Sequence, residues 1–206
     1  MRYKFDPNEL TEEKSLWDIY KKAFIIFPSK LQIAIVLTVA ICLGINAFVL
    51  ETNTATLLSN VRGWASFGFN FAITTLGFLI AGFTIFATLT KPDMMLAMMD
   101  HSKREYNLPT LKYNFFVFIK VFISYIFFAV VYVLAMLLGQ KGGFLSNVIE
   151  LLPNSLCVKI VLTKVCYVVI GSSFVHLLLQ LKSFIFNIYM IVMNMLRWEH
   201  KEKNVN

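Results

Sequence analysis

The chain has 206 residues, of which 58% are hydrophobic and only 15% are charged, with a formal net charge of +7. A soluble domain carries about 25% charged residues, whereas here the few charges cluster in short stretches and leave long uncharged runs. This distribution argues against a soluble enzyme, and the apolar segments leave no room for a separate catalytic domain. We expect no direct nucleic-acid binding, because no basic helix or aromatic-basic module is present.

The N-terminal segment, residues 1–30, predicts an amphipathic helix from Asn8 or Thr11 to Pro28. Its apolar positions recur at steps of four, three and four residues: Leu16, Tyr20, Ala23 and Phe27. Trp17 beside this face is typical of headgroup depth, so we expect an interfacial helix at the inner membrane surface. The alternative is that this helix docks a soluble partner.

Four apolar stretches are long enough to cross a bilayer as helices. A spanning helix must be apolar all round for about 20 residues, and the stretches that meet this standard are 31–50, 64–89, 115–138 and 165–187. The apolar pattern of the last stretch continues to Leu196, which predicts a cytoplasmic extension. The predicted fold is therefore an all-α integral membrane protein, with a four-helix transmembrane domain over 31–196 and a cytoplasmic tail over 197–206.

The loops between these spans are expected at 51–63, 90–114 and 139–162, the last with a short interfacial helix near 149–152. With both termini inside, 15 of the 19 Lys and Arg residues lie on the inner side and four on the outer side. Because positive charge concentrates on the cytoplasmic side, both termini are expected in the cytoplasm, with the protein in a bacterial inner membrane.

Membrane enzyme chemistry is not expected. None of the 12 acidic residues falls inside a predicted span, and proton-coupled transport usually needs a titratable group within the membrane. The cysteines Cys42, Cys157 and Cys166 form no CxxC pair and have no metal-ligand spacing. We therefore predict no catalytic residue, no metal site and no cofactor.

Small and weakly polar residues recur along the second span at heptad spacing: Asn70, Thr74, Gly77, Ala81, Thr84 and Thr88. Lipid gives helices no hydrophobic drive to associate, so close packing between small side chains supplies it. We name this face the packing stripe and interpret it as a contact with a neighbouring span of the same chain. A homo-oligomer contact and a pore lining are the alternatives.

The fourth span carries a polar stripe at steps of four, four, three and four residues: Ser172, His176, Gln180, Ser183 and Asn187. Polar groups cannot face lipid cheaply. They are expected to form interhelical hydrogen bonds, or alternatively to line a polar pore or sensing cavity built from several copies. His176 is the titratable member of this stripe.

Candidate docking residues for a cytoplasmic protein lie in three segments: Trp17, Met94, Met95, Met98, Met99 and Trp198. Pro92 and Asp93 suit the start of a helix that carries four Met residues within six positions. Flexible methionine side chains make an adaptable apolar surface. An interfacial helix resting on lipid is the alternative for this segment.

The whole layout resembles the KwaA family, the membrane subunit of the bacterial Kiwa anti-phage defence system. The residues closest to a motif are Thr90, Lys91, Pro92 and Asp93, followed by the Met-rich segment. The resemblance implies a homo-oligomeric envelope sensor that recruits a KwaB-like soluble DNA-binding effector. It assigns no functional residue in this sequence.

The sequence therefore predicts a non-enzymatic, homo-oligomeric membrane sensor or scaffold that recruits a cytoplasmic effector. A small channel or transporter subunit, based on the polar stripe of the fourth span, is the alternative. A membrane disruptor similar to holins is a third hypothesis.

Overall fold

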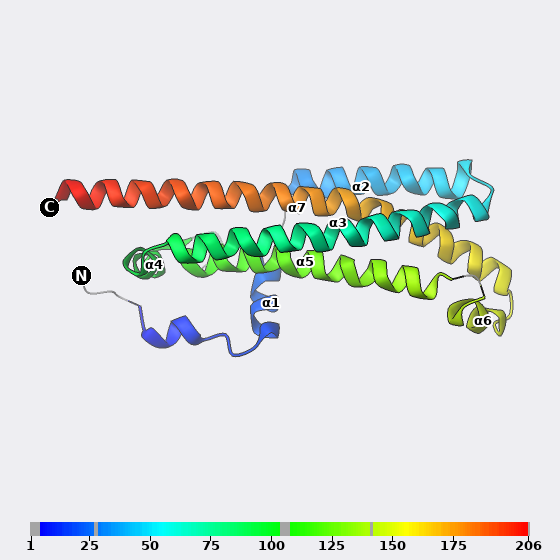
Figure 1. Cartoon of the computed structure of the whole chain (residues 1–206), viewed down its shortest axis with the longest axis horizontal. Coiled ribbons are helices and arrows are strands. Elements are labelled where there is room, and N and C mark those ends of the chain that lie inside the picture. The colour runs from blue at the N-terminus through cyan, green and yellow to red at the C-terminus, as the bar shows by residue number, and fades with distance from the viewer. Residues whose placement is uncertain (1–4, 27–28, 104–107, 141, 206) are drawn as a thin grey trace. The chain divides into compact units, whose positions relative to one another are not determined.

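The computed structural model describes residues 5–26, 29–103, 108–140 and 142–205 (Figure 1). Most of these residues are helical, and a short antiparallel pair of strands joins two of the helices. The elements are η1 (Pro7–Thr11), α1 (Leu16–Phe24), α2 (Lys30–Ile45), the π-helical turn η2 (Asn46–Leu50), α3 (Thr54–Leu89), α4 (Pro92–Met99), β1 (Ser102–Lys103), β2 (Leu108–Pro109), α5 (Thr110–Leu138), α6 (Phe144–Glu150) and α7 (Ser155–Val205).

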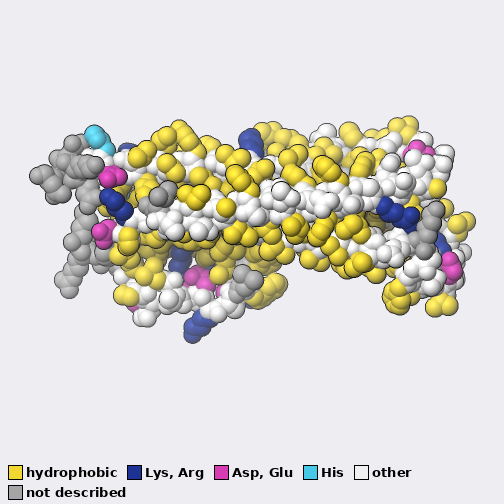
Figure 2. All heavy atoms as spheres, viewed as in Figure 1, with side chains coloured by type: hydrophobic (Ala, Val, Ile, Leu, Met, Phe, Trp, Pro, Cys, Tyr) yellow, Lys and Arg dark blue, Asp and Glu magenta, His cyan; other side chains and the backbone are white. Residues whose placement is uncertain are grey.

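The predicted fold class is confirmed, since the chain is an all-α protein with helices suited to a membrane. In the described chain, four helical stretches are long and apolar enough to cross a bilayer: Lys30–Leu50, Thr54–Thr88, Thr110–Leu138 and Ser155–His200. Figure 2 shows hydrophobic side chains over much of the visible surface, with the charged side chains gathered in a few places.

The second and fourth of these helices begin earlier than the sequence predicted. Asn53 accepts a hydrogen bond from the backbone N–H of Ala55 at 3.0 Å and so caps α3, which starts at Thr54 rather than at position 64. At the other helix, Asn154 takes a positive φ of 65° just before α7 begins, a conformation that asparagine tolerates. The early turns of α3 contain polar residues and Arg62, and those of α7 contain Lys159 and Lys164, which is why hydropathy alone did not include them.

The N-terminal helix is shorter than predicted, because a capping box fixes its start. Ser15 Oγ accepts from the N–H of Asp18 at 3.2 Å, and Asp18 Oδ2 accepts from the N–H of Ser15 at 3.1 Å. The helix α1 therefore begins at Leu16 and ends at Phe24, after the separate turn η1. Pro28, expected to end this helix, lies outside the described residues.

The described chain divides into two compact units. The described parts of Met1–Phe27, Gly77–Ile123 and Gln180–Asn206 form the first, here named the α4 unit. Pro28–Leu76 and Ser124–Leu179 form the second in the same way, here named the α2 unit. The helices α3, α5 and α7 each contribute one part of their length to each unit.

The α2 unit is held together by tyrosine hydroxyls and by close helix contacts. Tyr132 Oη lies 2.5 Å from Ser173 Oγ, and both side chains are buried. Tyr125 Oη donates to the carbonyl of Leu177 at 2.8 Å. Since an unsatisfied polar group is expensive inside a membrane, these bonds allow polar side chains to lie in the core.

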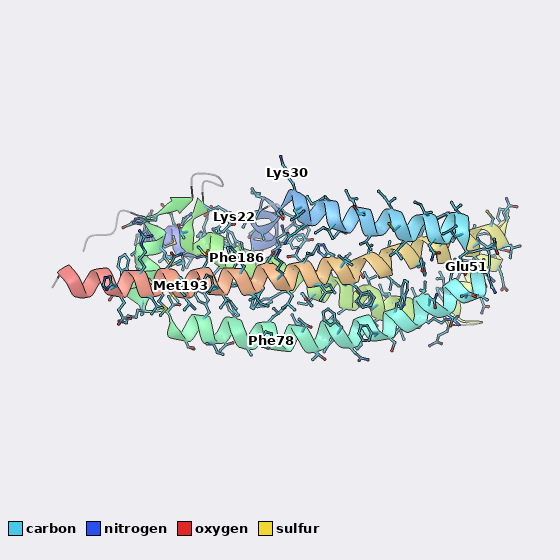
Figure 3. All side chains as sticks on the ribbon, turned by 90° about the horizontal axis from the view of Figure 1, so that it is seen from above. Lys22, Lys30, Glu51, Phe78, Phe186 and Met193 are labelled. Carbon is cyan, nitrogen blue, oxygen red and sulfur yellow. The ribbon has the colours of Figure 1, made fainter. Side chains whose placement is uncertain are left out.

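In the same unit α2 runs alongside α7 in the opposite direction. Gln32 Nε2 donates to the carbonyl of Leu179 at 3.3 Å, and Asn46 Nδ2 donates to Tyr167 Oη at 2.9 Å. Lys30 and Glu51 lie at the two ends of this first span (Figure 3). The start of the first span is therefore level with Leu179 of α7.

The α4 unit has an aromatic core, and α1 crosses it. The ring of Phe118 packs against Phe184, with centroids 5.2 Å apart, and against Phe86 at 5.4 Å. Ala23 and Ile26 are buried in one cluster with Phe116 and Val117 of α5. Figure 1 shows α1 running across the direction of α5. If α5 spans a bilayer, α1 therefore lies in the plane of its surface.

Candidate partner-docking site

The Met-rich segment forms α4, which starts at Pro92 as the sequence predicted. Lys91 is extended, and its carbonyl accepts from the N–H of Met95 at 3.1 Å. One face of this helix is buried in the α4 unit, since Met94 is 4% exposed and Met99 is 3% exposed. Met95 and Met98 are half-buried. The segment is therefore partly core, and only part of its methionine surface is available for docking.

The turn after α4 fixes His101 between two helices. His101 Nδ1 lies 3.1 Å from the carbonyl oxygen of Ala97. The carbonyl of His101 in turn accepts from the N–H of Thr110 at 2.8 Å and from the hydroxyl of Thr110 at 2.7 Å. These bonds hold the end of α4 against the start of α5.

The last turns of α7 lie beside α4. Lys91 Nζ lies 3.3 Å from Glu199 Oε1, which ties the start of α4 to α7 through an exposed ion pair. Such an exposed pair contributes little energy, but it places Trp198 beside α4. Arg197 forms no ion pair with any residue that the structure describes.

Together these elements line an open pocket of about 290 Å³ within the α4 unit. Its lining is mainly apolar, and the lining residues are Met94, Ala97, Met98, His101, Thr110, Asn194, Arg197 and Trp198. The structure thus brings three of the predicted docking residues, Met94, Met98 and Trp198, to one pocket. Met95, Met99 and Trp17 do not line it.

Trp17 belongs to a different surface of the α4 unit. Its side chain is exposed and stacks on Tyr20, with ring centroids 5.3 Å apart, and Lys21 Nζ lies 5.9 Å from the centre of its ring. Phe24 is also exposed on this helix. An exposed aromatic face flanked by a cation suits headgroup depth.

Four charged residues connect the N-terminal segment to α5 in a network that the sequence did not reveal. Lys22 Nζ lies 2.8 Å from Glu12 and 2.7 Å from Glu13, and Lys112 Nζ lies 3.2 Å and 2.8 Å from the same carboxylates. The side chains of Glu13 and Lys112 are only 8% and 9% exposed. Glu13 and Lys112 are about a hundred positions apart, so no spacing pattern in the sequence could indicate that they pair.

Charge pairing shifts the pKa values of this network. Burial raises the pKa of Glu13, but hydrogen bonds from Lys112 and Lys22 outweigh it and hold the pKa below the ordinary 4.5. Burial likewise lowers the pKa of Lys22, while its bonds to Glu12 and Glu13 raise the pKa above 10.5. Glu13 and Lys22 are therefore charged near neutral pH.

The packing stripe of α3 lies on an exposed face, and this corrects its interpretation. All six members are exposed: Asn70, Thr74, Gly77, Ala81, Thr84 and Thr88. The buried face of the helix instead carries Ala65, Ala72, Leu79 and Phe86. Packing of the stripe against another span of the same chain is therefore wrong. The buried face also contains small residues, Ala65 and Ala72, so residue size alone does not identify the face that packs within the chain.

The polar stripe of α7 lies on the inward side. Gln180 is 8% exposed, and the other members are half-buried: Ser172, His176, Ser183 and Asn187. Ser172 Oγ donates to the carbonyl of Val168 at 2.8 Å, and the His176 ring lies 5.5 Å from the ring of Phe128. This placement favours helix packing over a pore. The buried Ser173, adjacent to the stripe, was not among the expected residues.

Among the residues with described side chains, no group of three or more His, Cys, Asp or Glu residues could hold a metal ion. Cys42, Cys157 and Cys166 are all free thiols. Comparison of the chain with known protein families, characterised proteins and solved structures finds no match.

Proposed function

We propose that this chain is a non-enzymatic, oligomeric membrane sensor or scaffold that recruits a soluble effector in the cytoplasm. The setting implied by its resemblance to the KwaA family is anti-phage defence. One observation carries the proposal: α7 is much longer than one bilayer crossing needs, and its last part bears a row of exposed apolar side chains.

The first step concerns the length of the helices. The first span, Lys30–Leu50, has 21 residues and is about 31 Å long, which matches a hydrocarbon core of about 30 Å. The start of this span is level with Leu179 through the hydrogen bond from Gln32. Beyond Leu179, α7 continues to Val205, a length of about 39 Å. With 51 residues, α7 is therefore far longer than the roughly 20 residues that one crossing needs.

The second step concerns the surface of that continuation. Four exposed apolar side chains recur at steps of three, four and three residues: Phe186, Tyr189, Met193 and Leu196. We name them the α7 apolar face, and Figure 3 marks Phe186 and Met193 on this helix. A contiguous apolar surface outside hydrocarbon typically marks an interaction site. We propose that other copies of this chain and a soluble effector bind to the α7 apolar face.

Self-association is supported independently by the exposed stripe of α3. Asn70 is exposed and forms no hydrogen bond with any residue the structure describes. It lies about 24 Å along α3 from Thr54, which is within the length of the first span. A carboxamide that faces hydrocarbon needs a partner, and small neighbours such as Thr74 and Gly77 allow a second helix to approach closely.

The proposed orientation has both termini in the cytoplasm of a bacterial cell, on the basis of the 15-to-4 distribution of Lys and Arg. Cys157 is exposed and belongs to the proposed outer side. In cells with a permeabilised outer membrane, a membrane-impermeant maleimide should label Cys157 without entry into the cytoplasm. Labelling only after the inner membrane is opened would invert the orientation.

The function is tested by purification from the native cell in mild detergent, with the mass of the complex measured by light scattering. We expect an oligomer that retains a soluble protein in fixed ratio. Replacing Met193 and Leu196 by Glu should release that protein, while Lys182→Glu, an exposed change one turn before Phe186, should retain it. A monomer without any partner would contradict the proposal.

A further inference from the structure

The pocket beside α4 has the walls of a site for one large apolar side chain. Of its lining residues, Met94 and Ala97 are buried, and the Met98 and Trp198 side chains are half-buried. Its volume of about 290 Å³ is near the lower limit of ligand-binding cavities. Methionine and tryptophan provide a deformable and an aromatic wall, which suit a leucine, methionine or phenylalanine side chain.

One charged side chain that lines the pocket, Arg197, is available to bind a ligand. The Thr110 hydroxyl already donates to the carbonyl of His101, and the His101 Nδ1 is in contact with the carbonyl of Ala97. Arg197 and Asn194 also line the pocket, and neither has a hydrogen-bonding or ionic partner among the described residues. A guanidinium matches a carboxylate through two parallel hydrogen bonds, and a nearby amide adds a further donor.

We infer that this pocket binds a segment of the soluble partner in which a large apolar side chain and a carboxylate lie within one helical turn. The apolar side chain enters between Met94, Met98 and Trp198, and the carboxylate pairs with Arg197. This inference rests on the proposed function, because it names the chemistry that the recruited protein must present. It adds a specific charge requirement that the α7 apolar face does not have.

The test uses the full chain in lipid nanodiscs and a library of displayed 12-residue peptides. Selected peptides should share a large apolar residue with an Asp or Glu three or four positions away. The Arg197→Glu variant should reverse this preference and select Lys or Arg at the same spacing. Lys182→Glu, an exposed charge change elsewhere on α7, should leave the selected pattern unchanged.

A synthetic peptide with the selected pattern then gives an affinity. We expect Arg197→Gln to weaken its binding about tenfold, which corresponds to the loss of a charged hydrogen bond. Ala97→Phe, which fills the pocket, should abolish binding, and an unchanged far-ultraviolet spectrum would show that the variant is folded. Selection without an acidic residue, or equal selection by Arg197→Glu, would overturn the inference. Complete competition by phosphatidylglycerol vesicles would also overturn it, in favour of a lipid.

The two proposals fail in different ways. If the peptide pattern is found but native purification yields no soluble partner, the pocket chemistry stands and the recruitment function fails. If a soluble partner is recovered but Arg197→Glu binds it as well as the unchanged chain does, recruitment stands and the pocket is not its site.

Discussion

At the scale of single residues, Glu13 is the side chain on which docking of the N-terminal segment most depends. Its carboxylate accepts from Lys22 at 2.7 Å and from Lys112 at 2.8 Å, and its side chain is 8% exposed. Removing one partner of a buried ion pair costs about 3 kcal/mol, because the remaining charge stays buried. We expect Glu13→Gln to increase local opening of α1 roughly a hundredfold, measured as faster hydrogen exchange of the α1 amides.

The matched control is Glu12→Gln, because the Glu12 side chain contacts the same two lysines but is 59% exposed. Solvent already screens this carboxylate, so its replacement should change exchange much less. Equal exchange in the two variants would show that burial of Glu13 does not hold α1 in place.

The pH dependence of this docking follows from the same contacts. The pKa of Glu13 is held below its ordinary value of 4.5 in the folded chain, so its contribution is complete above 4.5 and is lost as pH falls through the lowered pKa. The pKa of Lys22 is raised above 10.5, so its contribution is complete below 10.5 and is lost as pH rises through the raised pKa. Exchange of the α1 amides should therefore be slowest relative to the intrinsic rate between these limits.

Gly68 is a second residue with a specific physical requirement. A Cβ at this position would lie 2.7 Å from Cζ of Tyr132 and 3.0 Å from Cζ of Phe174. Tyr132 is completely buried, so its ring cannot easily move away. We expect Gly68→Ala to destabilise the protein by about 2 kcal/mol, seen as a lower melting temperature in detergent.

Gly63 on the same helix provides the comparison, because a Cβ there would meet nothing within 4 Å. Alanine favours helix over glycine by about 1 kcal/mol, so Gly63→Ala should leave the melting temperature unchanged or raise it. If both variants melted alike, the close contact between α3 and α5 in the α2 unit would be refuted.

At the scale of elements, the sequence predicted the number and type of the helices better than their faces. The long apolar runs, each with at most one charged residue, specified four spans, since charge is costly inside hydrocarbon. The heptad spacing of small residues on α3 correctly identified a distinct face, but its burial within the chain was wrong. Small side chains are compatible with a core and with a contact between copies, so composition cannot separate the two.

The candidate site shows the same division. Met94, Met98 and Trp198 were expected to bind a partner, and the structure places them around one pocket. The contributions of His101, Asn194 and Arg197 could not be predicted, because the turn between α4 and α5 and the register of α7 determine them. The Glu13 network escaped prediction for a related reason, since it joins residues that are distant in sequence.

The exposed stripe of α3 predicts a contact between copies of the chain. In a background without native cysteines, Thr74→Cys should form disulfide-linked dimers in membranes on mild oxidation. Ile73→Cys is the matched control, because Ile73 is also exposed but lies on the neighbouring face of the helix. Dimers of the two variants in equal amounts, or none from Thr74→Cys, would count against self-association through this face.

At the scale of the whole molecule, the proposals depend on how far the hydrocarbon extends along α7. Leu178, Ile185 and Val192 lie at intervals of seven residues on one face of this helix, with 53%, 55% and 42% of each side chain exposed. Leu178 adjoins the level at which the first span begins. Val192 is 14 residues further along, which is about 21 Å of helix.

A nitroxide placed at each of these three positions in nanodiscs would report its surroundings by electron paramagnetic resonance. At Leu178 we expect easy collision with oxygen and little with a water-soluble nickel complex, as for a lipid-facing site. At Val192 the nickel complex should gain access, or both probes should be excluded if a copy or partner covers the helix. An oxygen-rich, nickel-poor signal at Val192 equal to that at Leu178 would place the end of α7 in lipid. In that case the α7 apolar face would need no protein partner, because the bilayer itself would cover it.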